Sequence, residues 1–209
     1  MIALLSYLLL MLLLETLKLK RLMLDNERQI RAVFDEDTIT VYQVYRKEIA
    51  LLAVEHQKFV PPFKMDRMTW IKPSFLWMMY RCGWAQKEGQ EYVLAIKIKR
   101  EGFLWALNNF CLSHFDSEIH NSREEWKEKL QKAPVRIQWD ADRNIHLEKL
   151  DYRSIQIGLS GEAVPKYINE WIVSITDITP LCKKIHSLIS EDIQQATNQL
   201  PKERLFSSS

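Results

Sequence analysis

Glycine is scarce in this chain, and its placement limits the folds and sites that the sequence can form. The 209 residues hold five glycines, and none precedes Gly83. Average usage of about 7% would give roughly 15 glycines in a chain of this length. Rossmann folds and P-loop proteins bind phosphate at glycine-rich turns, GxGxxG and GxxxxGK[ST], and neither pattern occurs here. Both classes are therefore excluded, while 47% hydrophobic residues still predict a packed globular chain.

Strand-like and helix-like patterns are mixed along the chain without strict alternation. Alternating apolar side chains and β-branched runs predict strands at 38–44, 68–72, 92–98, 135–139, 154–159 and 171–176, with a short piece at 145–147 paired across a turn at 140–144. Apolar residues at helical spacing, with Ser74 and Ser122 as capping residues, predict helices at 48–59, 74–81, 101–110, from 122 onward, and from 179 to Pro201. The mixture predicts one α+β domain over residues 23–200. Residues 201–209 are expected to form a frayed tail.

Residues 2–14 form an uninterrupted apolar run. Thirteen residues are too few to span a bilayer, which takes about 20, so no integral membrane span is predicted. A signal peptide carries its positive charges before the apolar run, whereas Lys18 and Lys20 follow it here. Three interpretations stay open: an anchoring or membrane-surface helix, an atypical signal peptide, or a translation start placed too early. We favour the third, with Met23 as the start and residues 1–22 as an extension outside the domain.

Charge and cysteine usage exclude few functions. A net charge of +2 indicates no particular partner, because nucleic-acid-binding proteins usually show a clear basic excess. Three widely spaced cysteines with apolar neighbours fit a reducing compartment, which predicts a cytoplasmic location. His114 and His120 flank two acidic residues but lack a third convergent ligand, so no metal site is predicted.

The densest functional pattern lies at residues 59–84, FVPPFKMDRMTWIKPSFLWMMYRCGW, which we call the aromatic–basic segment. A core strand followed by a core helix explains most of its aromatic residues. Lys64 and three further cations are interleaved with the rings, and a core explains those three less well: Arg67, Lys72 and Arg81. Aromatic rings stack on bases and cations pair with phosphates, so this composition suits a nucleotide or single-stranded nucleic acid. A non-catalytic binding module is therefore one hypothesis for the function.

Long strings of the sequence resemble the domain-of-unknown-function 4291 family. They include RQIRAVFDEDTITVYQVY, the aromatic–basic segment, VLAIKIKREGFLWAL, RSIQIGLSGEAV and EWIVSITDIT. The resemblance runs from about Arg28 to Pro180 and leaves residues 1–22 outside. That family has no established activity, so this resemblance implies no function.

The order of the elements more distantly resembles the ADP-ribosyltransferase superfamily. The matching segments are the strand at 41–45 before a helix, the strand at 69–71 before a short helix, and YINEWIV at 167–173. The resemblance implies a strongly bent or split, mainly antiparallel sheet flanked by helices, and an enzyme that uses NAD as its cofactor. Gln43 stands where that superfamily has His or Arg, and Trp70 stands where it has Tyr or Ser.

The same resemblance implies roles for individual residues. Glu170 would orient the nicotinamide ribose and stabilise the oxocarbenium-like charge that develops when the nicotinamide bond breaks. Gln43, the second catalytic candidate, would hydrogen-bond a ribose. The expected cofactor-binding residues are Trp70 and Tyr80 as stacking partners, Lys72, Arg28 and Arg31 as pyrophosphate partners, and Ser74. The alternatives are a solvated Glu170 at a strand start and a Gln43 bonded to a neighbouring side chain. The transferase hypothesis requires Gln43, Trp70 and Glu170 to converge on one cleft between two sheets.

Overall fold

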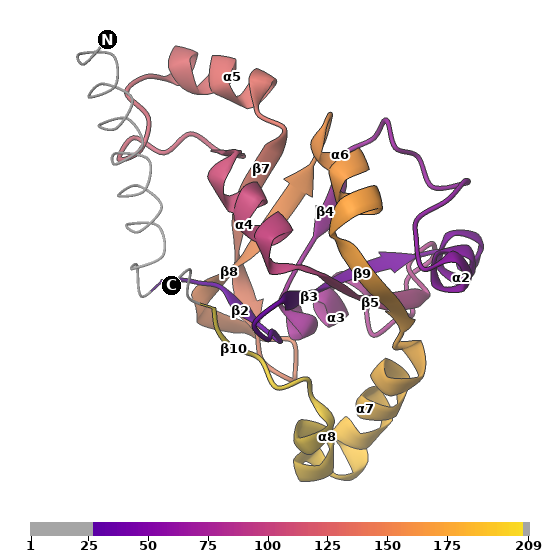
Figure 1. Ribbon diagram of the computed structural model, residues 1–209. Coiled ribbons are helices and arrows are strands. Elements are labelled where there is room, and N and C mark those ends of the chain that lie inside the picture. Colours follow the sequence, from indigo (N-terminus) through magenta and orange to yellow (C-terminus); the bar gives the residue numbers. More distant parts are fainter. Residues whose placement is uncertain (1–26, 207–209) are drawn as a thin grey trace.

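The computed structural model describes residues 27–206 and contains helices and several sheets (Figure 1), which confirms the predicted α+β class. The apolar extension, residues 1–22, lies outside the described residues. The strands are β1 (Arg28–Gln29), β2 (Arg31–Ala32), β3 (Thr38–Tyr45), β4 (Thr69–Ile71), β5 (Tyr92–Lys99), β6 (Phe110–Leu112), β7 (Val135–Arg143), β8 (Lys149–Leu159), β9 (Ile172–Asp177) and β10 (Arg204–Leu205). The helices are α2 (Lys47–His56), α3 (Phe75–Cys82), α4 (Arg100–Asn108), α5 (Arg123–Lys132), α6 (Ala163–Lys166), the π-helical turn η1 (Tyr167–Trp171), α7 (Thr179–Glu191) and α8 (Ile193–Gln199).

The strands divide between two larger sheets and one small one. In the first sheet the order is β1-β8-β7-β6, and β4 also pairs with β8. The second sheet has the order β3-β5-β9 and is antiparallel throughout. Strands β10 and β2 form the small sheet. An isolated antiparallel bridge between Tyr42 and Lys72 joins the two larger sheets. A divided sheet with mostly antiparallel pairing is therefore present, while the ADP-ribosyltransferase-like fold stays a prediction.

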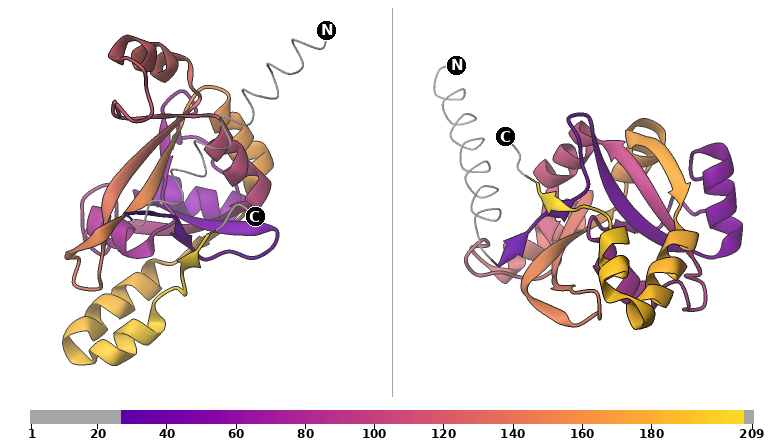
Figure 2. Two further views of the ribbon diagram at one scale, coloured as in Figure 1. Left: turned by 90° about the vertical axis from the view of Figure 1, so that its left-hand side faces the viewer. Right: turned by 90° about the horizontal axis from the view of Figure 1, so that it is seen from below.

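Buried apolar side chains form two core clusters. One joins both larger sheets and includes Ile96 from β5, Ile157 from β8 and Phe103 from α4. The other lies where α3 and the α7–α8 pair cover the second sheet, and it includes Tyr42 and Met79. Figure 2 shows α7 and α8 packed side by side at one end of the molecule, with α5 at the opposite end. Within residues 27–206, no helix is long and apolar enough to cross a membrane.

Both predicted helix caps are present. The Ser74 hydroxyl accepts a hydrogen bond from the Trp77 amide at 3.3 Å, and α3 ends at Gly83 in the left-handed conformation, with φ of 56°. The Ser122 hydroxyl accepts from the Glu125 amide at 3.1 Å and starts α5. A side-chain acceptor at this position satisfies one of the amides that the first helical turn leaves without a backbone partner.

Three local predictions were wrong. Residues 145–147 are a loop, because β7 continues through the expected turn as far as Arg143. The last helix divides at Asp192, whose carboxylate caps α8 by accepting from the Gln195 amide at 2.9 Å. The tail at 201–209 was expected to be frayed, yet in its described part, residues 201–206, β10 pairs with β2 and Phe206 is only 6% exposed. Long-range pairing of this kind leaves no periodic pattern in so short a segment.

Candidate functional site

A cleft of about 580 Å³ opens beside the bridge between Tyr42 and Lys72, where strand β3 separates from β4. The bridge itself is held by the Tyr42 amide donating to the Lys72 carbonyl at 2.8 Å. The walls of the cleft come from the end of β3, the segment 62–68, strand β4 and helix α3. Its volume lies within the usual range for small-molecule sites, roughly 300–1,000 Å³.

The charged residues of the cleft are all cations. Arg46, Lys64, Arg67, Lys72 and Arg81 line it, and no aspartate or glutamate of residues 27–206 is among its lining residues. All of these cations except Lys72 have exposed side chains. A concave surface with charges of one sign concentrates the electrostatic potential and attracts ligands of the opposite sign. The cleft is therefore suited to an anion, although the net charge of the whole chain is small.

Two tryptophans supply aromatic surface to the cleft. Trp70 is half-buried on β4, and Trp77 on α3 is 8% exposed. The Trp70 ring lies against Gly158 of β8, where an added Cβ would come within 2.9 Å of Trp70 Cη2 and of Met68 Sδ. Because Gly158 has no side chain, the Trp70 ring can pack directly against strand β8.

Lys72 is the buried cation of the inner wall, with a side chain that is 1% exposed. Its ammonium donates to Asp140 Oδ2 at 3.2 Å and to the Ser154 carbonyl at 3.3 Å. The third direction is occupied by the Trp77 ring, whose centroid lies 3.9 Å from Nζ. Burial lowers the pKa of Lys72 to about 8, and the neighbouring Asp140 carboxylate opposes that shift. An ammonium group with three such neighbours stabilises the inner wall of the cleft and has no free hydrogen for a pyrophosphate.

Gln43, which was expected to be a catalytic residue, is 3% exposed and belongs to a buried hydrogen-bond network. Its Nε2 amide lies 2.7 Å from Thr69 Oγ1, 3.0 Å from the Tyr45 hydroxyl and 3.0 Å from the Trp70 carbonyl. The Tyr167 hydroxyl donates to its Oε1 at 2.8 Å. The alternative given above, a Gln43 bonded to neighbouring groups, describes this side chain.

Two further expected cofactor-binding residues are engaged within the protein. The Ser74 hydroxyl donates to Asp142 Oδ1 at 2.7 Å while it caps α3, and its side chain does not line the cleft. Tyr80 is 42% exposed, and the Arg143 guanidinium carbon lies 3.6 Å from its ring centroid. The expected stacking partner Tyr80 therefore faces a different surface from that of Trp70.

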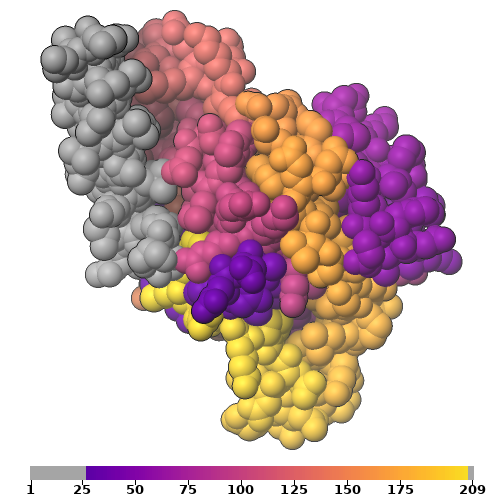
Figure 3. Space-filling model, viewed as in Figure 1, coloured from indigo at the N-terminus to yellow at the C-terminus, as the bar shows by residue number. Residues whose placement is uncertain are grey.

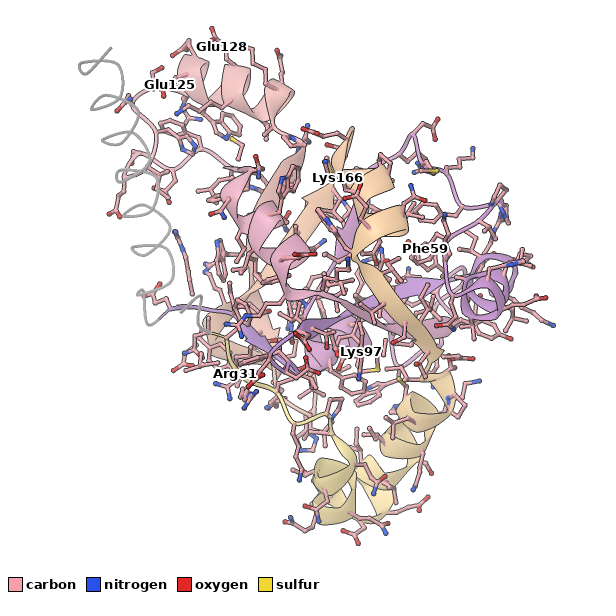
Figure 4. All side chains as sticks on the ribbon, in the orientation of Figure 1. Arg31, Phe59, Lys97, Glu125, Glu128 and Lys166 are labelled. Carbon is pink, nitrogen blue, oxygen red and sulfur yellow. The ribbon has the colours of Figure 1, made fainter. Side chains whose placement is uncertain are left out.

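Glu170 lies apart from the cleft. It is exposed in the turn η1 and lines a separate depression of about 510 Å³. The other lining residues of that depression are Lys99, Glu101, Gly102, Trp105, Lys166, Asn169 and Trp171. Figure 3 shows its helices α4 and α6 side by side, and Figure 4 labels Lys166, the last residue of α6. Of the three residues expected to converge, Gln43 and Trp70 do so and Glu170 does not.

The expected pyrophosphate partners Arg28 and Arg31 also lie elsewhere. Arg28 pairs with Asp116 at 3.2 Å, and the Arg31 guanidinium carbon lies 6.0 Å from the Tyr152 ring centroid. Neither residue lines the cleft. Within residues 27–206, no group of three or more His, Cys, Asp or Glu side chains is placed to hold a metal ion.

The comparison with protein families decides the classification. Residues 29–206 match the family model described as "Domain of unknown function (DUF4291)". The chain belongs to the DUF4291 family. No curated protein matches its sequence. Every residue that lines the cleft lies inside the DUF4291 match, which also extends past Pro201 to Phe206 and so includes β10.

Four polar residues that line this DUF4291 cleft were not among the residues that the sequence pointed to: Arg46, Tyr45, Thr69 and Gln156. Tyr45 follows Gln43 by two positions on the same strand, which places both side chains on one face and could have indicated it. Thr69 precedes Trp70 in the predicted strand, but an isolated threonine carries no signal of its own. Gln156 comes from β8, which is distant in sequence from the aromatic–basic segment, and only the pairing of β8 with β4 reveals it.

Proposed function

We propose that this DUF4291 protein binds a nucleotide in the cleft between β3 and β4. The phosphate groups would contact the exposed cations of the rim, and the base would lie against Trp70. The observation that carries the proposal is the lining itself, which combines four exposed cations and two tryptophans without any carboxylate of the described chain. Guanidinium groups bind phosphate oxygens through paired hydrogen bonds, and indole rings stack on bases.

The origin of the cations supports phosphate as the anionic part of the ligand. Lys64 and Arg67 come from the segment before β4, Arg46 follows β3, and Arg81 lies in the last turn of α3. Cations from three places in the chain thus face one volume. Cations gathered around one concave volume raise its positive potential, which favours the binding of an anion.

The size of the cleft favours one nucleotide or dinucleotide over a long strand. A volume of about 580 Å³ suits a single small ligand. A single-stranded nucleic acid would need a groove that continues past the cleft, so this partner is an outcome of the experiment rather than the proposal.

NAD is the second candidate ligand, because Gln43 and Trp70 both line the cleft where the two sheets separate. Binding of NAD requires no chemistry from Glu170. We do not extend the proposal to ADP-ribose transfer, since Glu170 lines the separate depression beside α4.

Binding can be tested by calorimetry and tryptophan fluorescence with AMP, IMP, UMP, NAD and a short oligonucleotide. We expect at least one mononucleotide or NAD to bind, with an affinity that falls as ionic strength rises. Arg67→Ala should weaken binding about tenfold. Lys97→Ala is the matched control, because it removes an exposed cation on β5 that does not line the cleft (Figure 4).

Three results would contradict the proposal. They are no binding of any mononucleotide or of NAD, an equal effect of Arg67→Ala and Lys97→Ala, and binding confined to the oligonucleotide. The last result would favour a single-stranded nucleic acid as the ligand.

A further inference from the structure

Two groups that bond to Gln43 fix which atoms donate and which accept in the buried hydrogen-bond network. The Trp70 carbonyl can only accept a hydrogen bond, so the Gln43 atom 3.0 Å away must be the Nε2 amide. The other amide atom, Oε1, then faces the Tyr167 hydroxyl, which must donate to it at 2.8 Å. Tyr167 is completely buried, and burial raises its pKa well above the usual value, so its hydroxyl keeps its proton.

The network has more hydroxyl and amide protons than acceptors. Nε2 of Gln43 carries two hydrogens, and three acceptors surround it: the Trp70 carbonyl, Thr69 Oγ1 and the Tyr45 hydroxyl. The two hydroxyls lie 3.2 Å apart, and one of them donates to the other. Each hydroxyl has one proton, so a single proton of the pair has no acceptor in the network. The Thr69 and Tyr45 hydroxyls make no other hydrogen bond within residues 27–206, and both residues line the cleft.

We infer that the Tyr45–Thr69 hydroxyl pair presents one hydrogen-bond donor to the cleft, and that the site selects a nucleotide whose base or amide group places a carbonyl oxygen there. This inference rests on the proposed nucleotide function and deepens it by naming the ligand class. An amino group at the same place would meet a donor and leave two donors facing each other. Sites built around a buried hydrogen bond reject ligands that cannot complete it.

The surroundings of the pair favour a fixed donor. Thr69 is 6% exposed, and Gln43 is 3% exposed. Burial raises the pKa of Tyr45 to about 12, so its hydroxyl remains protonated across the physiological range. A ligand that displaces water from this donor must offer an acceptor in its place, because a donor left unpaired in the closed site costs free energy.

Single and double substitutions of the Tyr45–Thr69 pair should differ in their effect on the donor. Thr69→Val removes one hydroxyl and frees the Tyr45 proton, and Tyr45→Phe frees the Thr69 proton in the same way. Each single variant therefore keeps one donor in the cleft, and only the double variant has none. A merely structural role would give effects that add, whereas this role gives weak single effects and a strong double effect.

The experiment compares IMP with AMP, which differ by a carbonyl and an amino group at the same ring position, and UMP serves as a second carbonyl ligand. We expect the native protein to bind IMP or UMP about tenfold more tightly than AMP. Both single variants should keep this preference within threefold, and the double variant should lose it. Thr179→Val is the control for removal of a buried hydroxyl, because Thr179 is also 6% exposed but accepts from the Val93 amide, and it does not line the cleft.

The outcomes separate the two proposals. If Arg67→Ala weakens all nucleotides but the double variant keeps the preference for a carbonyl, this inference is wrong and the nucleotide site stands. A preference for AMP in the native protein would also overturn it. If no nucleotide binds at all, the proposed function itself fails. Circular dichroism of each variant confirms that a loss of preference comes from a folded protein.

Discussion

Nζ of Lys72 lies 3.9 Å from the ring centroid of Trp77, so the residue after strand β4 and the helix α3 are held together by a buried cation and an aromatic face. The Asp140 carboxylate at 3.2 Å completes the arrangement from β7. One ammonium group thus connects three elements behind the cleft. Its protonation should therefore be visible in the stability of the whole fold.

Lys72→Met tests this connection through pH. Burial lowers the pKa of Lys72 from 10.5 to about 8, so between these values the unfolded chain binds more protons than the folded one. The cost of the buried charge is present in full below pH 8, and the free energy of unfolding should rise by about 3 kcal/mol from pH 8 to 10.5. Urea unfolding at several pH values should show this rise in the native protein and in the exposed-site control Lys97→Met. If Lys72→Met shows the same rise, the ammonium is not the group responsible.

The opposite pH dependence is expected at Glu203. Burial and the nearby Asp142 raise the pKa of Glu203 from 4.5 to about 8, while its Oε1 accepts from the Phe75 amide at the start of α3. The folded chain binds more protons between these values, so the free energy of unfolding should fall as pH rises from 4.5 to 8, by at most about 5 kcal/mol. Glu203→Gln keeps the acceptor and removes the titration. Guanidinium unfolding at pH 5 and 8.5 should show a gain in stability for this variant at the higher pH alone.

Glu203 and Phe206 also illustrate what the sequence could not predict. Strand β5 was identified because Leu94, Ile96 and Ile98 alternate with the residues between them, which is a local pattern. The segment PKERLFSSS has no such pattern, and its place depends on the pairing of β10 with β2, far away in the chain. Fold class and most elements followed from local periodicity, whereas the docking of the C-terminal segment is a tertiary effect.

Local sequence patterns also account for the part of the candidate site that could be predicted. The aromatic–basic segment is contiguous, so its tryptophans and cations could be found in the sequence, and several of them line the cleft. Glu170 was assigned from a short motif, and a motif cannot show which side of a sheet its residue faces. Gln43 was recognised as a polar residue within a strand, but the hydroxyls that bond to it come partly from β4.

Gly158→Ala should displace side chains that line the cleft. The new Cβ would lie 2.9 Å from Trp70 Cη2 and from Met68 Sδ, so these two side chains of the cleft lining must shift, and overpacking of this kind costs about 1–3 kcal/mol. Gly102→Ala is the matched control, because its Cβ would meet the Trp171 ring, away from the cleft. We expect both variants to lose stability in thermal unfolding, and only Gly158→Ala to weaken nucleotide binding. Equal affinities in the two variants would show that the Trp70 ring does not contact the ligand.

Phe206→Ala measures how firmly the C-terminal strand is docked. The Phe206 ring packs edge-on against Phe34 at 5.2 Å and Phe103 at 5.3 Å between ring centroids, and its amide donates to the Ile30 carbonyl at 2.8 Å. Truncation of a buried phenylalanine typically costs about 3–5 kcal/mol, so a loss of that size is expected in urea unfolding. Leu205→Ala, at the adjacent residue that is 59% exposed, should change the free energy of unfolding by less than about 0.5 kcal/mol. A small loss in both variants would mean that this segment adds little to the stability of the fold.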